Sequence, residues 1–259
     1  MDLTEFHRDG YQRVIGLIPA AEIPEVLREF DRLRDMASGS TPLDPRLRAL
    51  WTTTRSGQRI LRVLQNAHWT SPVIDALRLH PGVGRILKGI LGPDVKTVLT
   101  SAFWKPAGEI DTGIAYHQDA GFRQPAAAYR NLAQSYVSIA IALDPQDEEN
   151  GALHFIPGSH RQARLFPRPE QSVLAGYSGP AELRAFGVAP DSARAVRLDP
   201  GDAVMWNAFT LHGSPPNSSA DRDRRSLTIG SMRLADCDHG VAAYIAGRPV
   251  PVPRGGREP

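Results

Sequence analysis

Two residues in the stretch AYHQDAGF could bind a metal ion, His117 and Asp119. The surrounding residues are typical of a β-strand, and on a strand residues i and i+2 point to the same face. The imidazole and the carboxylate could therefore converge on one ion. Because a histidine two places before an aspartate occurs often by chance, the pair predicts a metal site only together with a third ligand.

His212 is the candidate for that third ligand among the eight histidines of the chain. It ends the β-rich run GDAVMWNAFTLH and is followed directly by Gly213. At such a strand end the backbone is fixed while the side chain can face a cavity. Two imidazoles and one carboxylate on one face of an ion leave the other positions open, as in non-haem Fe(II) oxygenases. We therefore expect His117, Asp119 and His212 to be the metal ligands and the catalytic centre.

An open iron site needs a cosubstrate, and the sequence RRS that follows His212 offers a group to hold one. If a strand begins at Arg224, then Arg224 and Ser226 share a face and Arg225 points away. A planar guanidinium beside a hydroxyl can bind a carboxylate through two parallel hydrogen bonds. A solvated surface charge is the alternative for any one arginine in the run DRDRR.

The elements that must position these residues change in character along the chain. Residues 21–36 carry apolar side chains at helical spacing, Ser71 and Pro72 mark a helix start, and Gly92 follows a second apolar stripe. From about Lys96 onward short β-rich runs alternate with turn residues: KTVLTSAFWK, QSYVSIAIAL, ALHFIP, ARAVRL, DAVMWNAFTLH and RSLTIGSMRL. Many short strands without alternating helices predict an antiparallel sandwich or jelly roll. We expect one domain over residues 1–259, with a helical part of about 1–95 packed on a β core of about 96–235.

Two further patterns bear on a binding cavity. In YVSIAIAL the small residues Ser138, Ala140 and Ala142 share one face, which fits a cavity wall or simple close packing. The segment from Gly158 to Arg194 is long and rich in proline, glycine and arginine. Such a segment is either a lid that orders over a bound substrate or a disordered surface excursion.

Composition narrows the protein class. Lys and Arg number 30 against 28 Asp and Glu, with no block of like charge, so charge does not suggest nucleic-acid binding. The single cysteine, Cys237, rules out an intrachain disulfide and a Cys-based zinc site. The N-terminus is too polar for a signal peptide, and the apolar runs are too short to span a bilayer. We expect a cytoplasmic protein that acts on a small molecule and binds neither nucleic acid nor a membrane.

Several motifs, taken together, resemble one family. They are HQD at His117–Asp119, NGALHFIPGSH at Asn150–His160, GDAVMW at Gly201–Trp206, LHGSPPN at Leu211–Asn217 and RRS at Arg224–Ser226. Their order and spacing resemble the phytanoyl-CoA dioxygenase family of Fe(II)/2-oxoglutarate-dependent oxygenases. FHRDGYQRVIGLIP and LHPGVGRILKGILGPDV resemble the N-terminal part of that family, so the resemblance covers nearly the whole chain.

The resemblance implies a double-stranded β-helix core that uses Fe(II), 2-oxoglutarate and O2. It implies that His117, Asp119 and His212 bind the iron. Arg224 would bind the distal carboxylate of 2-oxoglutarate with Ser214 or Ser226 assisting, and Arg225 is the alternative anchor. A carboxylate at Asp119 favours oxygenation over halogenation. The expected reaction is hydroxylation of an unactivated C–H bond with decarboxylation of 2-oxoglutarate to succinate; the same site could also desaturate, cyclise or epoxidise.

The sequence leaves the substrate open. A small metabolite or natural-product intermediate is the expectation by analogy. The candidate residues for binding it are Gln65, Asn66, Trp104, Lys105, Phe122, Arg123, Tyr129, Asn131, His160 and Arg161. Two other function classes remain as alternatives, namely a cupin-type isomerase or hydrolase with Zn²⁺ or Mn²⁺, and a non-catalytic jelly-roll binding module.

Overall fold

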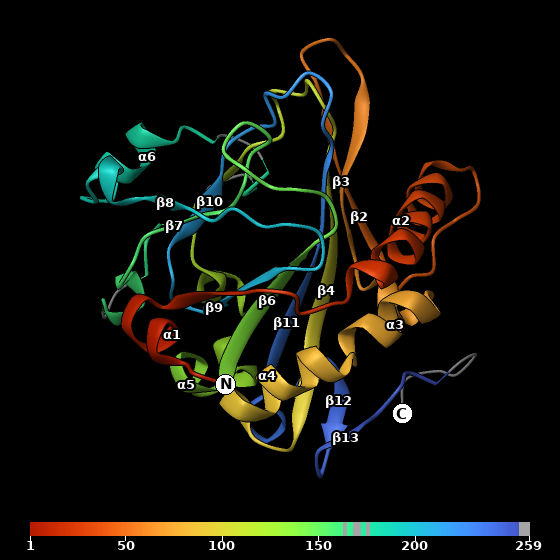
Figure 1. The fold of residues 1–259 in the computed structure, drawn as a ribbon, viewed down its shortest axis with the longest axis vertical. Helices are drawn as coiled ribbons and strands as arrows, with labels where there is room; N and C mark the ends of the chain where they lie inside the picture. The colour runs from red at the N-terminus through yellow and green to blue at the C-terminus, as the bar shows by residue number, and fades with distance from the viewer. Residues whose placement is uncertain (163–164, 168–171, 175–176, 254–259) are drawn as a thin grey trace.

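Two antiparallel sheets face one another across the centre of the protein (Figure 1). The computed structural model describes residues 1–162, 165–167, 172–174 and 177–253. Among them, no helix is both long enough and apolar enough to cross a membrane. The predicted jelly-roll fold with flanking helices is confirmed.

The larger sheet has nine strands and the smaller one has four. The main path of the larger sheet is β1 (Tyr11–Val14), β9 (Ala203–Asn207), β6 (Tyr136–Ala142), β11 (Arg224–Arg233), β4 (Val95–Lys105), β12 (Val241–Ile245) and β13 (Arg248–Pro249). A hairpin of β2 (Arg48–Thr53) and β3 (Arg59–Gln65) extends it through the pairing of β3 with β4. The smaller sheet runs β5 (Ile114–His117), β10 (His212–Ser214), β7 (His154–Phe155) and β8 (Arg194–Ala195).

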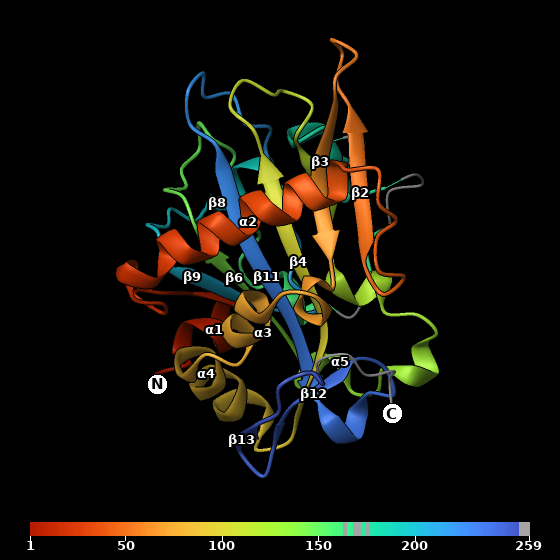
Figure 2. The same ribbon diagram turned by 90° about the vertical axis from the view of Figure 1, so that its right-hand side faces the viewer.

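Helices cover the outer face of the larger sheet (Figure 2). The α-helices are α1 (Thr4–Asp9), α2 (Ile23–Ser38), α3 (Pro72–Arg78), α4 (Pro81–Leu91), α5 (Leu132–Ser135) and α6 (Pro180–Ala185). The 3-10 turns are η1 (Ala20–Glu22), η2 (Ala67–Trp69), η3 (Asp119–Phe122), η4 (Ala126–Ala128), η5 (Ser159–Arg161), η6 (Pro190–Ser192) and η7 (Leu234–Asp236). The predicted cap is present, since Ser71 Oγ accepts a hydrogen bond from Ile74 N at 3.1 Å. In the apolar stripe of α2, Phe30 and Leu33 are fully buried, whereas Leu27 and Met36 are partly buried.

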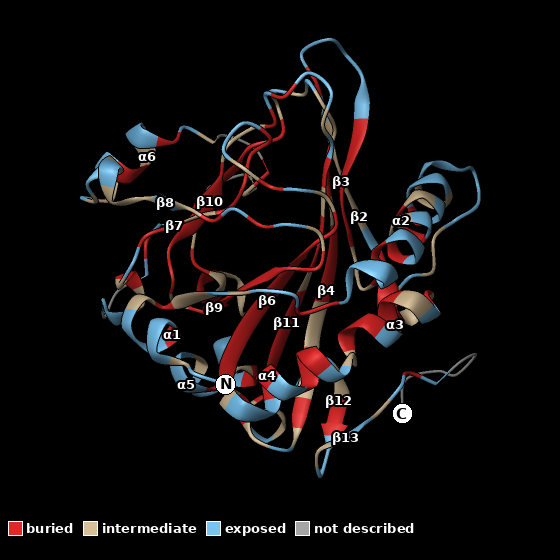
Figure 3. Ribbon diagram, in the orientation of Figure 1, coloured by how far each residue is buried: buried red, intermediate tan, exposed pale blue. Residues whose placement is uncertain are grey.

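Alternation along the central strands separates the core from a cavity between the sheets. On β11, Leu227 and Ile229 pack with the helices, whereas Ser226 and Thr228 line the cavity. Strand β6 is buried along its whole length (Figure 3), and Ile139 belongs to the helix-side core. Of the small-residue face of β6, Ser138 lines the cavity, while Ala140 and Ala142 pack between the sheets.

Three local predictions were wrong. The N-terminal part, predicted as helical, also supplies β1, β2 and β3, because short alternating runs there pair with the larger sheet. The run predicted to end at His212 is split: β9 ends at Asn207 in the larger sheet, and His212 begins β10 in the smaller one. Strand β5 ends at His117, so Asp119 lies at the start of η3 and not on the same strand.

Candidate active site

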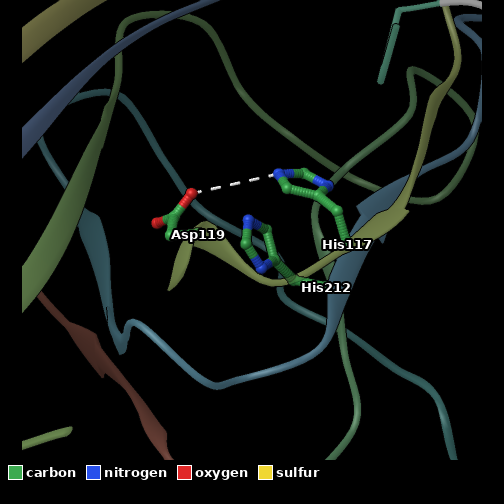
Figure 4. Close-up of side chains that lie close together, drawn as sticks. All are labelled: His117, Asp119 and His212. Atoms are coloured by element: carbon green, nitrogen blue, oxygen red, sulfur yellow. Dashed lines mark ion pairs between the residues drawn. The ribbon is translucent and has the colours of Figure 1, made fainter. Parts of the chain in front are cut away.

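His117, Asp119 and His212 lie together at one side of the cavity (Figure 4). His117 and His212 are directly opposite one another where β5 pairs with β10, and their ring centroids are 4.2 Å apart. The turn of η3 after β5 brings Asp119 Oδ1 to 4.0 Å from His117 Nε2. One ligand atom from each of the three residues lies within 4.8 Å of the others.

Backbone carbonyls fix the orientation of both imidazoles. His117 Nδ1 lies 2.8 Å from the carbonyl oxygen of Ala115, and His212 Nδ1 lies 2.9 Å from that of Thr210. An Nδ1–H that donates to a carbonyl leaves Nε2 with its lone pair free for a metal. Burial lowers the pKa of His117 to about 3 and also lowers the pKa of His212. Both rings are therefore neutral at pH 7, as coordination requires.

Asp119 presents one carboxylate oxygen to the histidines and has hydrogen bonds on the other. Its Oδ2 accepts hydrogen bonds from Ser138 Oγ at 2.7 Å and from Trp206 Nε1 at 3.0 Å. Burial alone would raise the pKa of this carboxyl, but His212 and Arg123 nearby hold it below its ordinary value. Two neutral imidazoles and one ionised carboxylate form a donor set that fits Fe(II).

A cavity of about 450 Å³ extends from these three residues and is lined by Arg224, Ser226 and Thr228 of β11. Arg224 is fully buried, and its Nε and Nη2 both donate to Gln146 Oε1, at 3.2 and 3.0 Å. Burial and the neighbouring Arg62 lower the pKa of Arg224 to about 10, so the group remains charged at pH 7. A buried cation that lines a cavity and forms no ion pair with a described residue is suited to binding an anion.

Arg225 points to the other face of β11. Its Nε and Nη2 donate to the two carboxylate oxygens of Asp144, each at 2.9 Å, and Asp31 lies 3.6 Å away. This side chain is therefore occupied by carboxylates on the helix side of the sheet. The geometry agrees with the predicted alternation, in which Arg224 faces the cavity and Arg225 points away from it.

The sequence model of the phytanoyl-CoA dioxygenase (PhyH) family matches residues 6–226. The chain belongs to this family. It is 25% identical to the "Probable alpha-ketoglutarate-dependent hypophosphite dioxygenase" of Stutzerimonas stutzeri, over 87% of this chain and 76% of that protein. It is 31% identical to the "Ectoine dioxygenase" of Nocardia farcinica, over 83% of this chain and 72% of that protein.

A solved structure shares the fold. It is the epimerase SnoN in complex with Fe3+, alpha ketoglutarate and nogalamycin RO, with a TM-score of 0.65 and 23% identity over 99% of this chain and 90% of that one. With the family match, the protein is an Fe(II)/2-oxoglutarate-dependent oxygenase, an oxidoreductase whose cofactors are iron and 2-oxoglutarate.

Ser214 and Lys105 lie behind the cavity wall. Ser214 Oγ donates to the carbonyl of Gly151 at 2.6 Å and accepts from Lys105 Nζ. Lys105 Nζ also bonds to the carbonyls of Gly151 and Pro215. Neither is among the cavity-lining residues that the structure describes, so both hold loops together at the end of β4.

The structure brings four of the ten substrate candidates to the cavity, namely Gln65, Asn66, Phe122 and Arg123. Trp104 lies on the opposite face of β4 and packs against Phe30 of α2 with ring centroids 5.0 Å apart. We therefore do not retain Trp104 as a substrate-binding residue.

Four other candidates lie outside the cavity, on loops or at helix ends. Tyr129 stacks on His239, Asn131 donates to Asp236, and His160 contacts the carbonyl of His7. Arg161 follows His160 in η5 and is exposed.

Residues that sequence reasoning missed complete the cavity wall. Arg48 and Leu50 reach it from β2, and Tyr136 and Trp206 reach it from β6 and β9. Val173 belongs to the predicted lid segment, and its carbonyl accepts from Ala115 N at 2.8 Å. Residues 163–164, 168–171 and 175–176 of that segment lie outside the described residues, so its ordering over a substrate stays a prediction.

Proposed function

We propose that His117, Asp119 and His212 bind the Fe(II) and that Arg224, with Ser226, binds the distal carboxylate of 2-oxoglutarate. The single observation that carries this proposal is that the three donor atoms and the buried guanidinium belong to one cavity. The reaction is hydroxylation of an unactivated C–H bond of a small molecule by O2, in which one oxygen atom enters the new hydroxyl and the other enters succinate as 2-oxoglutarate loses CO2.

When bound, the iron would activate O2, which is the oxidant for C–H cleavage. The residues of the chain position the metal and the cosubstrate. His117 and His212 offer Nε2 from rings that their carbonyl partners hold in place, and Arg224 orients the cosubstrate. Apolar side chains such as Leu50 and Phe103 line part of the cavity, where they exclude water and pack against a substrate so that its C–H bond lies near the metal.

The names of the relatives support a small-molecule substrate, since one is a dioxygenase of hypophosphite and another of ectoine. The solved structure of the same fold is called an epimerase. Desaturation, cyclisation and epoxidation therefore stay open as alternatives to hydroxylation. A cupin-type isomerase or hydrolase and a plain binding module are disfavoured, because neither needs a buried arginine such as Arg224 beside the donor set.

The test is a product analysis with purified protein, Fe(II), 2-oxoglutarate, air and a panel of small metabolites. Hydroxylation adds the mass of one oxygen atom to the substrate and yields one succinate for each product molecule. A product that instead lacks two hydrogens would assign desaturation. Product formation without any consumption of 2-oxoglutarate would overturn the proposed function.

A further inference from the structure

The lining of the cavity is unbalanced in charge. Three arginines, Arg48, Arg123 and Arg224, line it, and Asp119 is the one carboxylate among the lining residues that the structure describes. Asp119 belongs to the metal site and Arg224 to the cosubstrate. Arg123 and Arg48 therefore have no role in binding the iron or 2-oxoglutarate.

Arg123 has donors that no described residue satisfies. Its Nη2 donates to the Tyr136 hydroxyl at 2.8 Å, and its guanidinium lies over the Tyr136 ring, 5.0 Å from the centroid. Its Nε is buried and has no hydrogen-bond partner in the described part of the chain. No ion pair of Arg123 with a carboxylate is present there either, although Asp119 exerts an attraction at longer range. A buried donor without a partner is rare in native proteins, and Arg123 is a residue that lines the cavity.

The position of Arg123 relates it to the metal site. The Tyr136 hydroxyl lies 3.2 Å from Ser138 Oγ, and Ser138 Oγ donates to Asp119 at 2.7 Å. The preceding residue, Phe122, packs edge-on against the ring of His117 with centroids 5.7 Å apart. A ligand group bound to Arg123 would thus be held beside the metal-binding carboxylate, with the rest of the ligand in the cavity.

We propose that Arg123 is the substrate anchor and that the substrate is a small organic anion whose carboxylate or phosphonate group pairs with this guanidinium. The proposal rests on the proposed function. The Tyr136 ring beneath the guanidinium holds the guanidinium in position. The planar set of N–H donors of an arginine matches the oxygen atoms of a carboxylate or of a phosphonate.

The remaining wall specifies the rest of the substrate. It combines apolar side chains with neutral polar ones: Leu50, Leu99, Phe103, Ile114, Phe122 and Val173 are apolar, and Gln65, Asn66, Ser101 and Ser172 are polar. The substrate body is therefore uncharged, part apolar and part polar, with the anionic group at one end. Arg48 is exposed, lines the same cavity and forms no ion pair with a described residue, so it adds a positive potential that attracts an anion.

The experiment compares matched anionic and neutral probes by calorimetric titration. The protein is first loaded with Ni(II) and 2-oxoglutarate, so that neither the metal site nor Arg224 takes the probe. The probes are cyclohexanecarboxylate, cyclohexylphosphonate and the neutral cyclohexanecarboxamide. We expect the wild-type protein to bind at least one anion at least about tenfold more tightly than the amide, because a buried charge pair is worth that much or more. The two anions distinguish a carboxylate site from a phosphonate site.

The variants assign the preference to Arg123. Arg123→Gln should bring the ratio of anion to amide affinity close to one, and Arg123→Lys should retain part of it. Arg130→Gln, in the same connection but paired with Asp238 outside the cavity, should keep the wild-type ratio. Because the readout is a ratio, a general weakening of the variant does not imitate the effect.

An absent anion preference in the wild-type protein, or a preference that survives Arg123→Gln, would overturn the assignment of Arg123. The loading step tests the proposed function separately. If Ni(II) and 2-oxoglutarate do not bind, the proposed function fails; if they bind and the preference does not depend on Arg123, only the substrate anchor fails.

Discussion

Arg224 and Arg225 are adjacent in the chain and point to opposite faces of β11. Arg224 is buried in the cavity wall against Gln146, whereas Arg225 pairs with both carboxylate oxygens of Asp144 on the helix side. The strand period of two thus directs one arginine of this dipeptide to the cavity and the other to an ion pair on the helix side.

The first prediction separates the two arginines. Arg224→Ala should raise the half-saturating concentration of 2-oxoglutarate by well over tenfold, because loss of one partner of a buried charge pair typically costs about 2–5 kcal/mol. Arg225→Ala should lower the stability of the protein but change that concentration little. Turnover measured against 2-oxoglutarate concentration tests both variants. A large effect of Arg225→Ala alone would make Arg225 the anchor.

The second prediction concerns the hydrogen bonds to Asp119. Trp206→Phe removes the indole N–H that donates to Asp119 Oδ2 and keeps an aromatic ring. Loss of such a partner typically costs about 10–100-fold in metal affinity, so we expect a loss of at least about tenfold. Titration with Ni(II) measures it. The control is Trp104→Phe, since the Trp104 indole N–H is buried on the other face of the sheet and has no hydrogen-bond partner among the described residues. An equal loss in both variants would contradict the prediction.

The third prediction concerns stability at acidic pH. His68 is buried beside Thr100, with Nδ1 at 3.0 Å from Oγ, and burial lowers its pKa to about 3. Below the unfolded pKa of about 6.5, the unfolded chain gains a proton that the folded protein does not accept until pH about 3. The free energy of unfolding should therefore fall as the pH drops, by about 2 kcal/mol between pH 8 and pH 5 from this group.

Urea unfolding of His68→Gln at the two pH values tests the contribution of His68. The variant should lose that part of the pH dependence, while Thr100→Val, which keeps the histidine, should retain it. A pH dependence identical in His68→Gln and the wild-type protein would show that another group is responsible.

The sequence predicted the parts of the site that depend on residue type and local spacing. The combination of two histidines and one aspartate distinguishes His117, Asp119 and His212 from the other polar residues, because this combination is an unusual set of metal donors. Strand alternation distinguishes Arg224 from Arg225. The convergence of the triad had a different cause from the expected one. Asp119 reaches the site through the turn of η3 after β5, and His212 through a new strand in the second sheet.

The remaining residues depend on tertiary pairing that spacing does not reveal. Gln146 contacts Arg224 across 78 positions of sequence, and Trp206 contacts Asp119 across 87. Trp104 was misassigned because aromatic residues occur on both faces of β4, where Phe103 lines the cavity and Trp104 packs on α2. Which of two adjacent aromatic residues lines the cavity depends on which face of the strand the neighbouring helix covers.

The most direct test of the central claim is iron-dependent conversion of 2-oxoglutarate to succinate by the wild-type protein and by His117→Ala, Asp119→Ala and His212→Ala. The matched control is His154→Gln, since His154 lies on β7 beside β10 but outside the cavity lining that the structure describes. We predict that the wild-type protein and the control form succinate only when Fe(II) is supplied, and that each of the three variants falls to background while keeping its fold by circular dichroism. Succinate formation by the wild-type protein without iron, or at the wild-type rate by any of the three variants, would contradict the account.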